Sequence, residues 1–318
     1  MHPSIVKTMC AAALMLGAAT ASAQTWPTQR VTLVVPFTAG GPTDVVARAL
    51  GPSLEEQWKQ PFIVENRPGA GSIVGTDYVA RSTPNGYTML FSGNAVYTLN
   101  FFQKDLPFQP SQMRAVVDIA SAPYIVVANP QLGFKGMTDL INYAKSKPGT
   151  VNYGTLPNTV FDLDYKILED KTGTRMTAIP FNGVTQAGEA LMRGDIQFYY
   201  GVYAAVMPLV RAGKMTAVGA TGPKRFDLAP DVPTLKEQGV DITTGFDFGI
   251  FVPSKTPEDA VSRIASGMTN AVRTPAMAAK LKDFGYEVPA DPLHWEERLQ
   301  ADVQAYGAVV KRLGLQPK

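Results

Sequence analysis

Four segments of small and polar residues stand where predicted β-strands end, and these segments are the best suited to bind a ligand. Their sequences are TAGGPTD (38–44), GAGS (69–72), SGN (92–94) and GTLPNT (154–159). In open α/β sheets, ligands bind at the carboxyl ends of the strands. Backbone N–H groups at 40–43 and 155–159 are placed to bind an oxyanion, because glycine permits close approach and a helix start leaves N–H groups free. We therefore predict that these two loops, on two facing units, hold a small anion, most simply a carboxylate.

Groups for catalysis or metal binding are scarce by comparison. Beyond the first 23 residues the chain has one histidine, His294, and no cysteine. His294 stands at a predicted helix start, and no G-x-S-x-G elbow is present to supply a serine nucleophile. A zinc site needs three or four His or Cys ligands, which the chain does not have beyond the first 23 residues. Carboxylate-only chemistry through Asp162, Asp164 or Asp247 stays open as an alternative. We expect no catalytic residue, no metal and no cofactor.

The loop Gly69–Gly75 could instead bind a nucleotide, since it follows a predicted strand and precedes a predicted helix. Its spacing is G-x-G-x-x-x-G, one residue off the dinucleotide fingerprint, and no acidic residue ends the next strand. We interpret this loop as a tight turn that brings a helix close to the ligand.

The N-terminal segment has the pattern of a cleavable signal peptide. Lys7 precedes an apolar run that ends in Ala21-Ser22-Ala23, so residues 1–23 are predicted to be removed before Gln24. The mature chain is then exported to the periplasm. The net charge of the 318-residue chain is +2, and loss of Lys7 lowers it to +1. Such a near-neutral surface does not indicate nucleic-acid binding or a polybasic membrane patch.

Strand-like and helix-like segments alternate along the chain, which is typical of α/β units with parallel sheets. Strands are predicted at 31–37, 61–67, 87–93, 124–129, 150–154, 175–181, 195–201, 215–221 and 244–254. Pro52 is expected to kink or shorten the first helix. Two successive units of the same design predict two lobes, residues 24–123 plus 245–318 and residues 124–244. Two chain crossings between them would form a hinge that suits closure on a ligand.

The motifs follow one another in an order that resembles a known family. They are VPFTAGGPTDVVAR, VENRPGAGSIVGT, PNGYTMLFSGNA, KPGTVNYGT, IPFNG, RAGKMTAVGATGPKR and APDVPTLKEQG. The chain resembles, over essentially all of residues 25–318, the periplasmic solute-binding proteins of tripartite tricarboxylate transporters, the Bug family. The resemblance implies a two-lobed periplasmic-binding-protein (Venus flytrap) fold with a ligand cleft between the lobes. It also implies a monomer that binds a small carboxylate, delivers it to membrane permease subunits and has no nucleic-acid partner.

The resemblance further implies which residues bind the ligand. In the family the first loop holds a carboxylate largely through backbone groups and bridging water, and the corresponding stretch here is Phe37–Asp44. The predicted site residues are Phe37, Ala39, Gly40, Gly41, Thr43 and Asp44 in this loop, Ser92, Gly93, Asn94 and Tyr97 after the third strand, Thr155, Asn158 and Thr159 in the facing loop, and Gly201 and Tyr203.

Departures from the family pattern bear on the ligand. The chain reads GTLPNTVF where many relatives have a Ser-rich, His-containing stretch, and it has Gly201 where relatives often carry an Asp that could hold an amine. An amino-acid ligand is therefore disfavoured. Aromatic residues expected at the cleft wall, which are Tyr97, Tyr200, Tyr203, Phe161 and Phe246, favour an aromatic or otherwise bulky carboxylate, or a dicarboxylate, in place of citrate. Two alternatives stay open, a ligand sensor that presents its closed form to a membrane receptor and an exported α/β enzyme.

Overall fold

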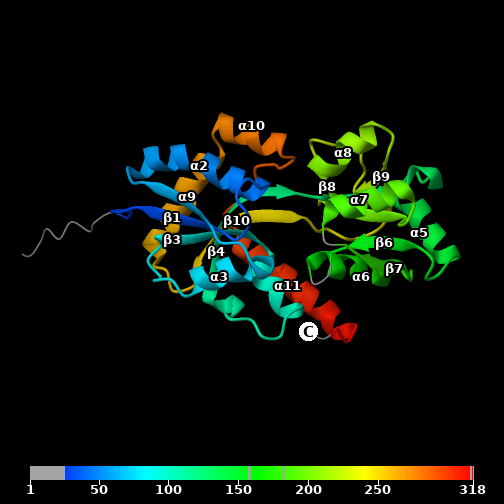
Figure 1. Ribbon diagram of the computed structural model, residues 1–318, viewed down its shortest axis with the longest axis horizontal. Helices are drawn as coiled ribbons and strands as arrows, with labels where there is room; N and C mark the ends of the chain where they lie inside the picture. Colours follow the sequence, from blue (N-terminus) through cyan, green and yellow to red (C-terminus); the bar gives the residue numbers. More distant parts are fainter. Residues whose placement is uncertain (1–25, 157–158, 182, 316, 318) are drawn as a thin grey trace, which may run out of the picture.

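Two α/β lobes, each built on a five-stranded sheet, make up the protein in the computed structural model (Figure 1). The structure describes residues 26–156, 159–181, 183–315 and 317, so the predicted signal peptide lies outside the described residues. Within these ranges, no helix has the length and apolar character needed to cross a membrane.

The first lobe has the strand order β2-β1-β3-β10-β4. β1 pairs in parallel with β2 and β3, whereas β10 runs antiparallel to both of its neighbours. The strands are β1 Val31–Val35, β2 Phe62–Asn66, β3 Thr88–Gly93, β4 Met113–Ala122 and β10 Phe246–Pro253. The helices are α2 Pro42–Trp58, α3 Ile73–Ala80, α4 Ala95–Thr98, α9 Glu258–Val272, α10 Pro275–Asp283 and α11 Trp295–Arg312, with short 3-10 turns η1 Ala70–Ser72, η2 Leu99–Phe101 and η3 Pro110–Gln112.

The second lobe repeats this arrangement with the strand order β7-β6-β8-β5-β9. β6 pairs in parallel with β7 and β8, and β5 runs antiparallel to β8 and β9. The strands are β5 Tyr124–Ala128, β6 Asn152–Thr155, β7 Thr177–Pro180, β8 Phe198–Val202 and β9 Thr216–Ala220. The helices are α5 Met137–Ser146, α6 Val160–Thr172, α7 Val184–Arg193 and α8 Tyr203–Arg211, with η4 Pro130–Leu132 and η5 Lys236–Gln238. β6 and α6 are therefore the counterparts of β1 and α2.

The interior strand β1 shows why a run rich in Val and Leu indicates a strand that is buried on both faces. Leu33 and Val34 are both fully buried, although they point to opposite faces, because helices cover the sheet on both sides. Helix α2 contributes Val46, Leu50 and Leu54 to one of these faces. The helix continues through Pro52 to Trp58, so the expected shortening does not occur. Packing of the apolar face outweighs the hydrogen bond that proline removes.

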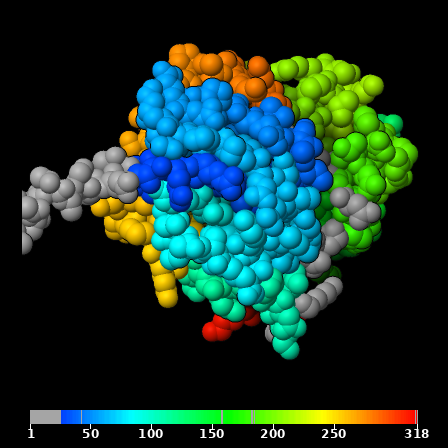
Figure 2. Space-filling model, turned by 60° about the vertical axis from the view of Figure 1, so that its left-hand side comes forward, coloured from blue at the N-terminus to red at the C-terminus, as the bar shows by residue number. Residues whose placement is uncertain are grey.

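The chain passes between the sheets at two places. β4 ends at Ala122 and β5 begins at Tyr124, which leaves only Pro123 between the lobes, and the return crossing precedes β10. β4 is a strand that the sequence analysis did not predict. We propose the lobe limits at residues 123/124 and 244/245 on this strand membership. Figure 2 shows the blue and cyan residues of the first lobe against the green residues of the second.

Helix α11 belongs in sequence to the first lobe but reaches the second. Its C-terminal half lies beside α6 (Figure 1), where Tyr306 packs against Val160 and Leu163. Phe246 contacts the cores of both lobes. The N-terminus of α6, which follows the predicted second-lobe loop, is therefore at the boundary between the lobes.

Candidate ligand-binding site

The loop between β1 and α2 is held in shape by Asp44, in the first turn of α2. The Asp44 side chain is almost completely buried, and its Oδ2 accepts hydrogen bonds from the backbone N–H of Gly40 (2.9 Å) and from Arg48 Nε (3.0 Å). Its Oδ1 accepts from Asn66 Nδ2 (2.9 Å) and lies 3.0 Å from Arg48 Nη2. Burial raises the pKa of this carboxyl, but hydrogen bonds from Arg48, Gly40 and Asn66 outweigh burial and lower the pKa below its ordinary value. Asp44 thus stays ionised and positions the loop.

The start of α2 offers the backbone donors of this loop, because the N–H groups of Gly40 and Gly41 are already bonded to Asp44 Oδ2 and to the Thr38 carbonyl. Residues 38–40 are exposed, Gly41 is the N-cap of α2, and Asn66 Nδ2 also donates to the Phe37 carbonyl at 3.2 Å. Thr43 and Asp44 are in the first helical turn, where N–H groups have no partner four residues earlier. These N–H groups and the helix dipole favour an anion. Arg48 and Asn66 were missed by the sequence analysis, although the Asp44–Arg48 spacing of four residues is a signal that could have found the first.

The glycine loop after β2 packs against the first loop. Gly69, Ala70, Gly71 and Ser72 all have positive φ, between 45° and 144°, so a tight turn is formed by strained backbone. A Cβ at Gly75 would lie 2.8 Å from the Pro36 Cβ, so glycine is required for α3 to approach the chain there. The geometry is that of the tight turn expected from the sequence.

The end of β3 is only partly available to a ligand. Ser92 is fully buried and its Oγ has no hydrogen-bond partner among the described residues, while Asn94 is half-buried. A Cβ at Gly93 would lie 2.7 Å from the Asp247 carbonyl oxygen, because β10 runs alongside.

Tyr97 is not brought to the lobe boundary. Its ring is 3% exposed and packs edge-on against Phe251 at 5.6 Å. Its hydroxyl donates to Glu296 Oε2 (2.6 Å) and accepts from the Ala115 N–H (3.1 Å). The expectation that Tyr97 faces the ligand is corrected by this anchoring in the core of the first lobe.

In the second lobe, the hydroxyl groups of the predicted loop form hydrogen bonds within the protein. Thr155 Oγ1 donates to Asp162 Oδ1 at 2.5 Å, and Thr159 Oγ1 donates to the Leu156 carbonyl at 2.6 Å. Thr159 is the N-cap of α6, and Asp162 is in its first turn. Asn158 lies outside the described residues. Both hydroxyls therefore shape the loop, which leaves backbone N–H groups at the start of α6 as its donors.

Gly201 and Tyr203 contact other residues of the second lobe. A Cβ at Gly201 would lie 2.2 Å from Val206 Cγ1, so close packing in the core of the second lobe requires glycine at this position. The Tyr203 hydroxyl donates to the Leu228 carbonyl and accepts from Arg211 Nη2, each at 3.0 Å.

Tyr200 and Phe161, two more aromatic residues of the expected cleft wall, are structural as well, whereas Phe246 is half-buried and contacts the cores of both lobes. Tyr200 is 1% exposed and stacks on Tyr165 at 4.4 Å, which in turn stacks on Tyr153 at 4.1 Å. Phe161 packs on Tyr124 at 4.6 Å. This column of rings fills the space between the sheet and α6, so the predicted aromatic platform is instead the core of the second lobe.

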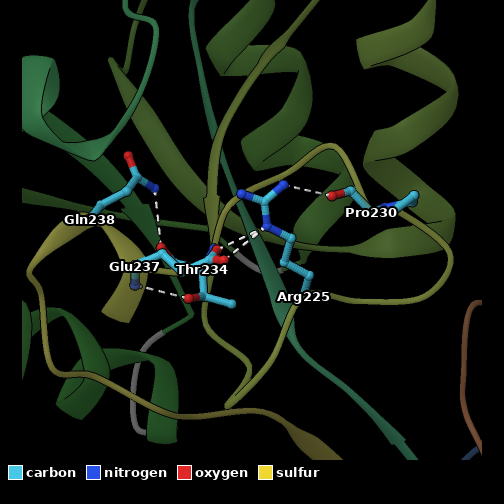
Figure 3. Close-up of polar contacts among 5 residues, drawn as sticks. All are labelled: Arg225, Pro230, Thr234, Glu237 and Gln238. Carbon is cyan, nitrogen blue, oxygen red and sulfur yellow. Dashed lines mark hydrogen bonds and ion pairs between the residues drawn. The ribbon is translucent and has the colours of Figure 1, made fainter.

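The loop that follows β9 is fixed by a network of polar contacts (Figure 3). Arg225 Nε lies 3.0 Å and 3.1 Å from the two carboxylate oxygens of Glu237, and Arg225 Nη1 donates to the Pro230 carbonyl at 3.0 Å. Glu237 and Thr234 bond each other's backbone N–H, and Gln238 Nε2 donates to the Thr234 carbonyl at 3.3 Å. Residues 222–239 therefore form an ordered wall.

The part of that wall at residues 222–228 lines a cavity of about 820 Å³, which none of the predicted ligand-binding residues lines, although the candidate carboxylate Asp247 does. The cavity lies where the chain crosses between the lobes, and its lining includes Asp118, Asp247, Arg298 and Asp302. Among the described residues, no group of three or more His, Cys, Asp or Glu side chains could hold a metal ion. His294 is exposed at the N-cap of α11 and bonds Asp291 at 2.8 Å, as a helix-start residue does.

Comparison with known proteins gives concordant matches. A family described as the tripartite tricarboxylate transporter family receptor matches residues 46–315. A protein of the UPF0065 group from Bordetella pertussis is 31% identical over 99% of each chain. The periplasmic binding protein BugD has a TM-score of 0.72 at 25% identity, over 92% of this chain and 100% of its own. R. palustris Rpa4515, solved with adipate, has a TM-score of 0.76 at 28% identity, over 92% of this chain and 100% of its own. The expected two-lobed fold is confirmed.

Proposed function

The chain belongs to the receptor family of tripartite tricarboxylate transporters, and from this premise we propose that it captures a small dicarboxylate between its lobes and delivers it to membrane permease subunits. It is a periplasmic solute-binding protein of this family and not an enzyme. The observation that carries the proposal is the loop at residues 37–44, whose shape is fixed by the buried Asp44 carboxylate and which leads into the first turn of α2, where the N–H groups of Thr43 and Asp44 have no partner four residues earlier.

In this proposal one ligand carboxylate binds the N–H groups around Gly41 and Thr43, with Ser92–Asn94 beside them. The second carboxylate binds at the start of α6, near Thr155–Thr159. Recognition rests on backbone dipoles and on water, since the one cationic side chain bound to the first loop, Arg48, is already paired with Asp44. A ligand that touches both lobes stabilises the closed state by the contacts it gains there.

An aliphatic ligand is favoured over an aromatic one. Tyr97 and Tyr200, which supported an aromatic carboxylate, are buried in the cores of their lobes. Rpa4515, a relative at 28% identity, was solved with the aliphatic dicarboxylate adipate. We place the ligand of this chain in the same chemical class.

Isothermal titration calorimetry of the mature chain with adipate, succinate, citrate and benzoate tests this choice. We expect an aliphatic dicarboxylate to bind at least about tenfold more tightly than benzoate or citrate, because two carboxylate ends match two loops. A preference for benzoate, or no binding by any of the four acids, contradicts the proposal.

The variant Gly41→Val tests the location of the site. Gly41 has φ −73° and a Cβ there would meet only the Thr38 carbonyl, at 3.4 Å, so valine is accommodated without backbone strain. The added side chain covers the neighbouring N–H groups and should weaken dicarboxylate binding by about tenfold or more. Glu65→Gln, which removes an exposed ion pair with Arg67, is the matched control and should bind as the wild type does.

Export and delivery need separate tests. N-terminal sequencing of the protein from the periplasm should begin at Gln24 if residues 1–23 are a signal peptide. Cross-linking of the liganded chain in membranes, followed by mass spectrometry, should recover permease subunits. Recovery of a membrane receptor instead would favour the sensor interpretation.

A further inference from the structure

The cavity at the chain crossings has the size of a small-molecule site and lies apart from the predicted loops. Its volume of about 820 Å³ is within the range of ligand pockets. One wall is the ordered loop of the second lobe at 222–228, and the opposite wall is the segment 286–291 with the α11 residues Arg298 and Asp302. The end of β4 and the start of β10 form its floor, through Asp118 and Asp247. The walls therefore come from both lobes.

The floor carries more negative than positive charge. Asp118, Asp247 and Asp302 share a single guanidinium, that of Arg298, whose Nη2 lies 2.6 Å from Asp118 Oδ2. Asp118 is fully buried, and its Oδ1 has no hydrogen-bond partner among the described residues. Asp302 is open to solvent and forms no hydrogen bond or ion pair with a described residue. A buried carboxylate oxygen without a hydrogen-bond donor is energetically costly, so a cation bound at the floor would be stabilised.

The titration behaviour of these groups agrees with the geometry. Burial and the nearby Asp247 raise the pKa of Asp118 well above its ordinary value. Although part of the Asp302 surface is open to solvent, desolvation by the surrounding protein and the same neighbour raise the pKa of Asp302 to about 6, and Arg298 acts in the opposite direction. One guanidinium therefore does not compensate three carboxylates.

Two of the other cations that line the cavity are already paired with carboxylates. Lys224 pairs with Asp227 at 3.3 Å, and Arg225 pairs with Glu237 (Figure 3). Glu287 accepts a hydrogen bond from the Asp227 backbone N–H at 3.0 Å. Lys282, on α10, lines the cavity and is exposed to solvent. The excess negative charge is concentrated on the floor.

We propose that this cavity is a second ligand site, which takes a small organic ammonium ion on the carboxylates of Asp118, Asp247 and Asp302. An organic cation suits the site better than a bare metal ion, because the cavity walls offer apolar surface that a metal ion does not use. Apolar groups on the walls, which include Leu228, Val288 and Ala301, fit the alkyl part of such an ion.

Isothermal titration calorimetry of the full mature chain with n-butylammonium chloride, at constant ionic strength and without carboxylate ligand, tests the site directly. The wild type should bind one equivalent with a dissociation constant of about 1 mM or tighter. Asp302→Asn and Asp247→Asn should each weaken binding by about tenfold, since each removes a floor charge. Asp291→Asn is the matched control, because Asp291 lines the same cavity but is paired with His294, and it should bind within about twofold of the wild type.

Two further titrations identify the chemistry recognised. n-Butanol, which has the same alkyl chain without the charge, should not bind. Failure of the wild type to saturate, equal binding by all four proteins, or equal binding of n-butanol overturns the proposal. Tighter binding of magnesium chloride than of n-butylammonium, lost in Asp302→Asn, also overturns it, since the site would then be a metal site. None of these results depends on dicarboxylate binding.

Discussion

Helices α2 and α6 follow the equivalent interior strands β1 and β6 of two sheets with equivalent strand orders, and each carries a buried carboxylate that is used differently. Asp44 on α2 is 3% exposed and accepts hydrogen bonds from Gly40, Arg48 and Asn66, all within the first lobe. Asp164 on α6 is 1% exposed and accepts only from hydroxyls, those of Thr244 and Tyr306, each at 3.0 Å. Thr244 lies at the return crossing and Tyr306 is on α11.

The difference in partners changes both charge and mechanical role. A guanidinium and amide donors keep Asp44 ionised, with a lowered pKa. Burial raises the pKa of Asp164 to about 7, because the hydroxyl donors of Tyr306 and Thr244 relieve it only in part and Asp302 adds repulsion. Asp44 therefore fixes its own loop, whereas Asp164 ties the second lobe to α11 and to the hinge. We infer that the first loop is rigid, whereas the position of α6 changes when the two lobes move relative to each other.

Removing the packing under α6 should have the largest effect. Tyr165 is fully buried between Tyr153 and Tyr200, so Tyr165→Ala should lower the free energy of unfolding by about 3–5 kcal/mol in urea titrations. Tyr143→Ala, at a half-buried position on α5, is the control and should cost about 1 kcal/mol. Equal losses in the two variants would contradict the role of the tyrosine column in holding α6.

The pH dependence of stability should come next. The pKa of Asp164 is raised from 3.8 to about 7 on folding, so its contribution to stability is complete below about pH 4 and is lost as the pH rises to 7. Relative to Asp164→Asn, the wild type should lose about 1.4 kcal/mol of unfolding free energy per pH unit in this window. Denaturant titrations at pH 5, 6 and 7 measure it, and a constant difference between the two proteins would show that Asp164 is ionised throughout.

A smaller loss is expected at the corresponding carboxylate of the first lobe. Asp44→Ala removes the acceptor that Arg48, Asn66 and the Gly40 N–H share, which should cost about 1–3 kcal/mol of stability. Dicarboxylate affinity should fall by about tenfold, because the loop is no longer held in the binding conformation. Glu65→Gln again serves as control, and unchanged affinity in Asp44→Ala would remove this network from the site.

The smallest effect should come from an exposed ion pair between the same two elements that Asp164 joins. Arg312 Nη2 on α11 lies 2.7 Å from Asp170 Oδ2 on α6, and both side chains are substantially open to solvent. Arg312→Ala should change the unfolding free energy by about 0.5 kcal/mol or less. A larger loss would mean that surface charge, and not the buried Asp164 junction, holds α11 against the second lobe.

Much of the fold could be predicted from local patterns. The apolar runs of β1 and β10 and the glycine turns between strands and helices are local signals, and two repeated units indicated two lobes. β4 was missed although MRAVVDIASA is apolar, because only Pro123 separates its end from β5 and no longer turn marks the boundary. Pairing of β10 with both β3 and β4 is a long-range feature that no local pattern encodes.

Side-chain direction and distant partners limited the prediction of the site. Tyr97 was placed at the cleft by its position after a strand end and Tyr203 by the resemblance to the family, but their hydroxyls are bound to the Glu296 carboxylate and to the Leu228 carbonyl, which no local pattern indicates. Asn66 supports the first loop from the end of a neighbouring strand. The cavity at the crossings is assembled from four separated parts of the chain, so only the three-dimensional structure could reveal it.

The central claim is that a dicarboxylate is held by backbone N–H groups of the first loop and of the start of α6. Amide chemical-shift mapping of the ¹⁵N-labelled full mature chain during titration with adipate tests it most directly. The account predicts the largest amide shift changes at Gly41, Thr43 and Thr159. Unmoved amides at these residues, with the largest changes at Asp118 and Asp302 instead, would contradict it.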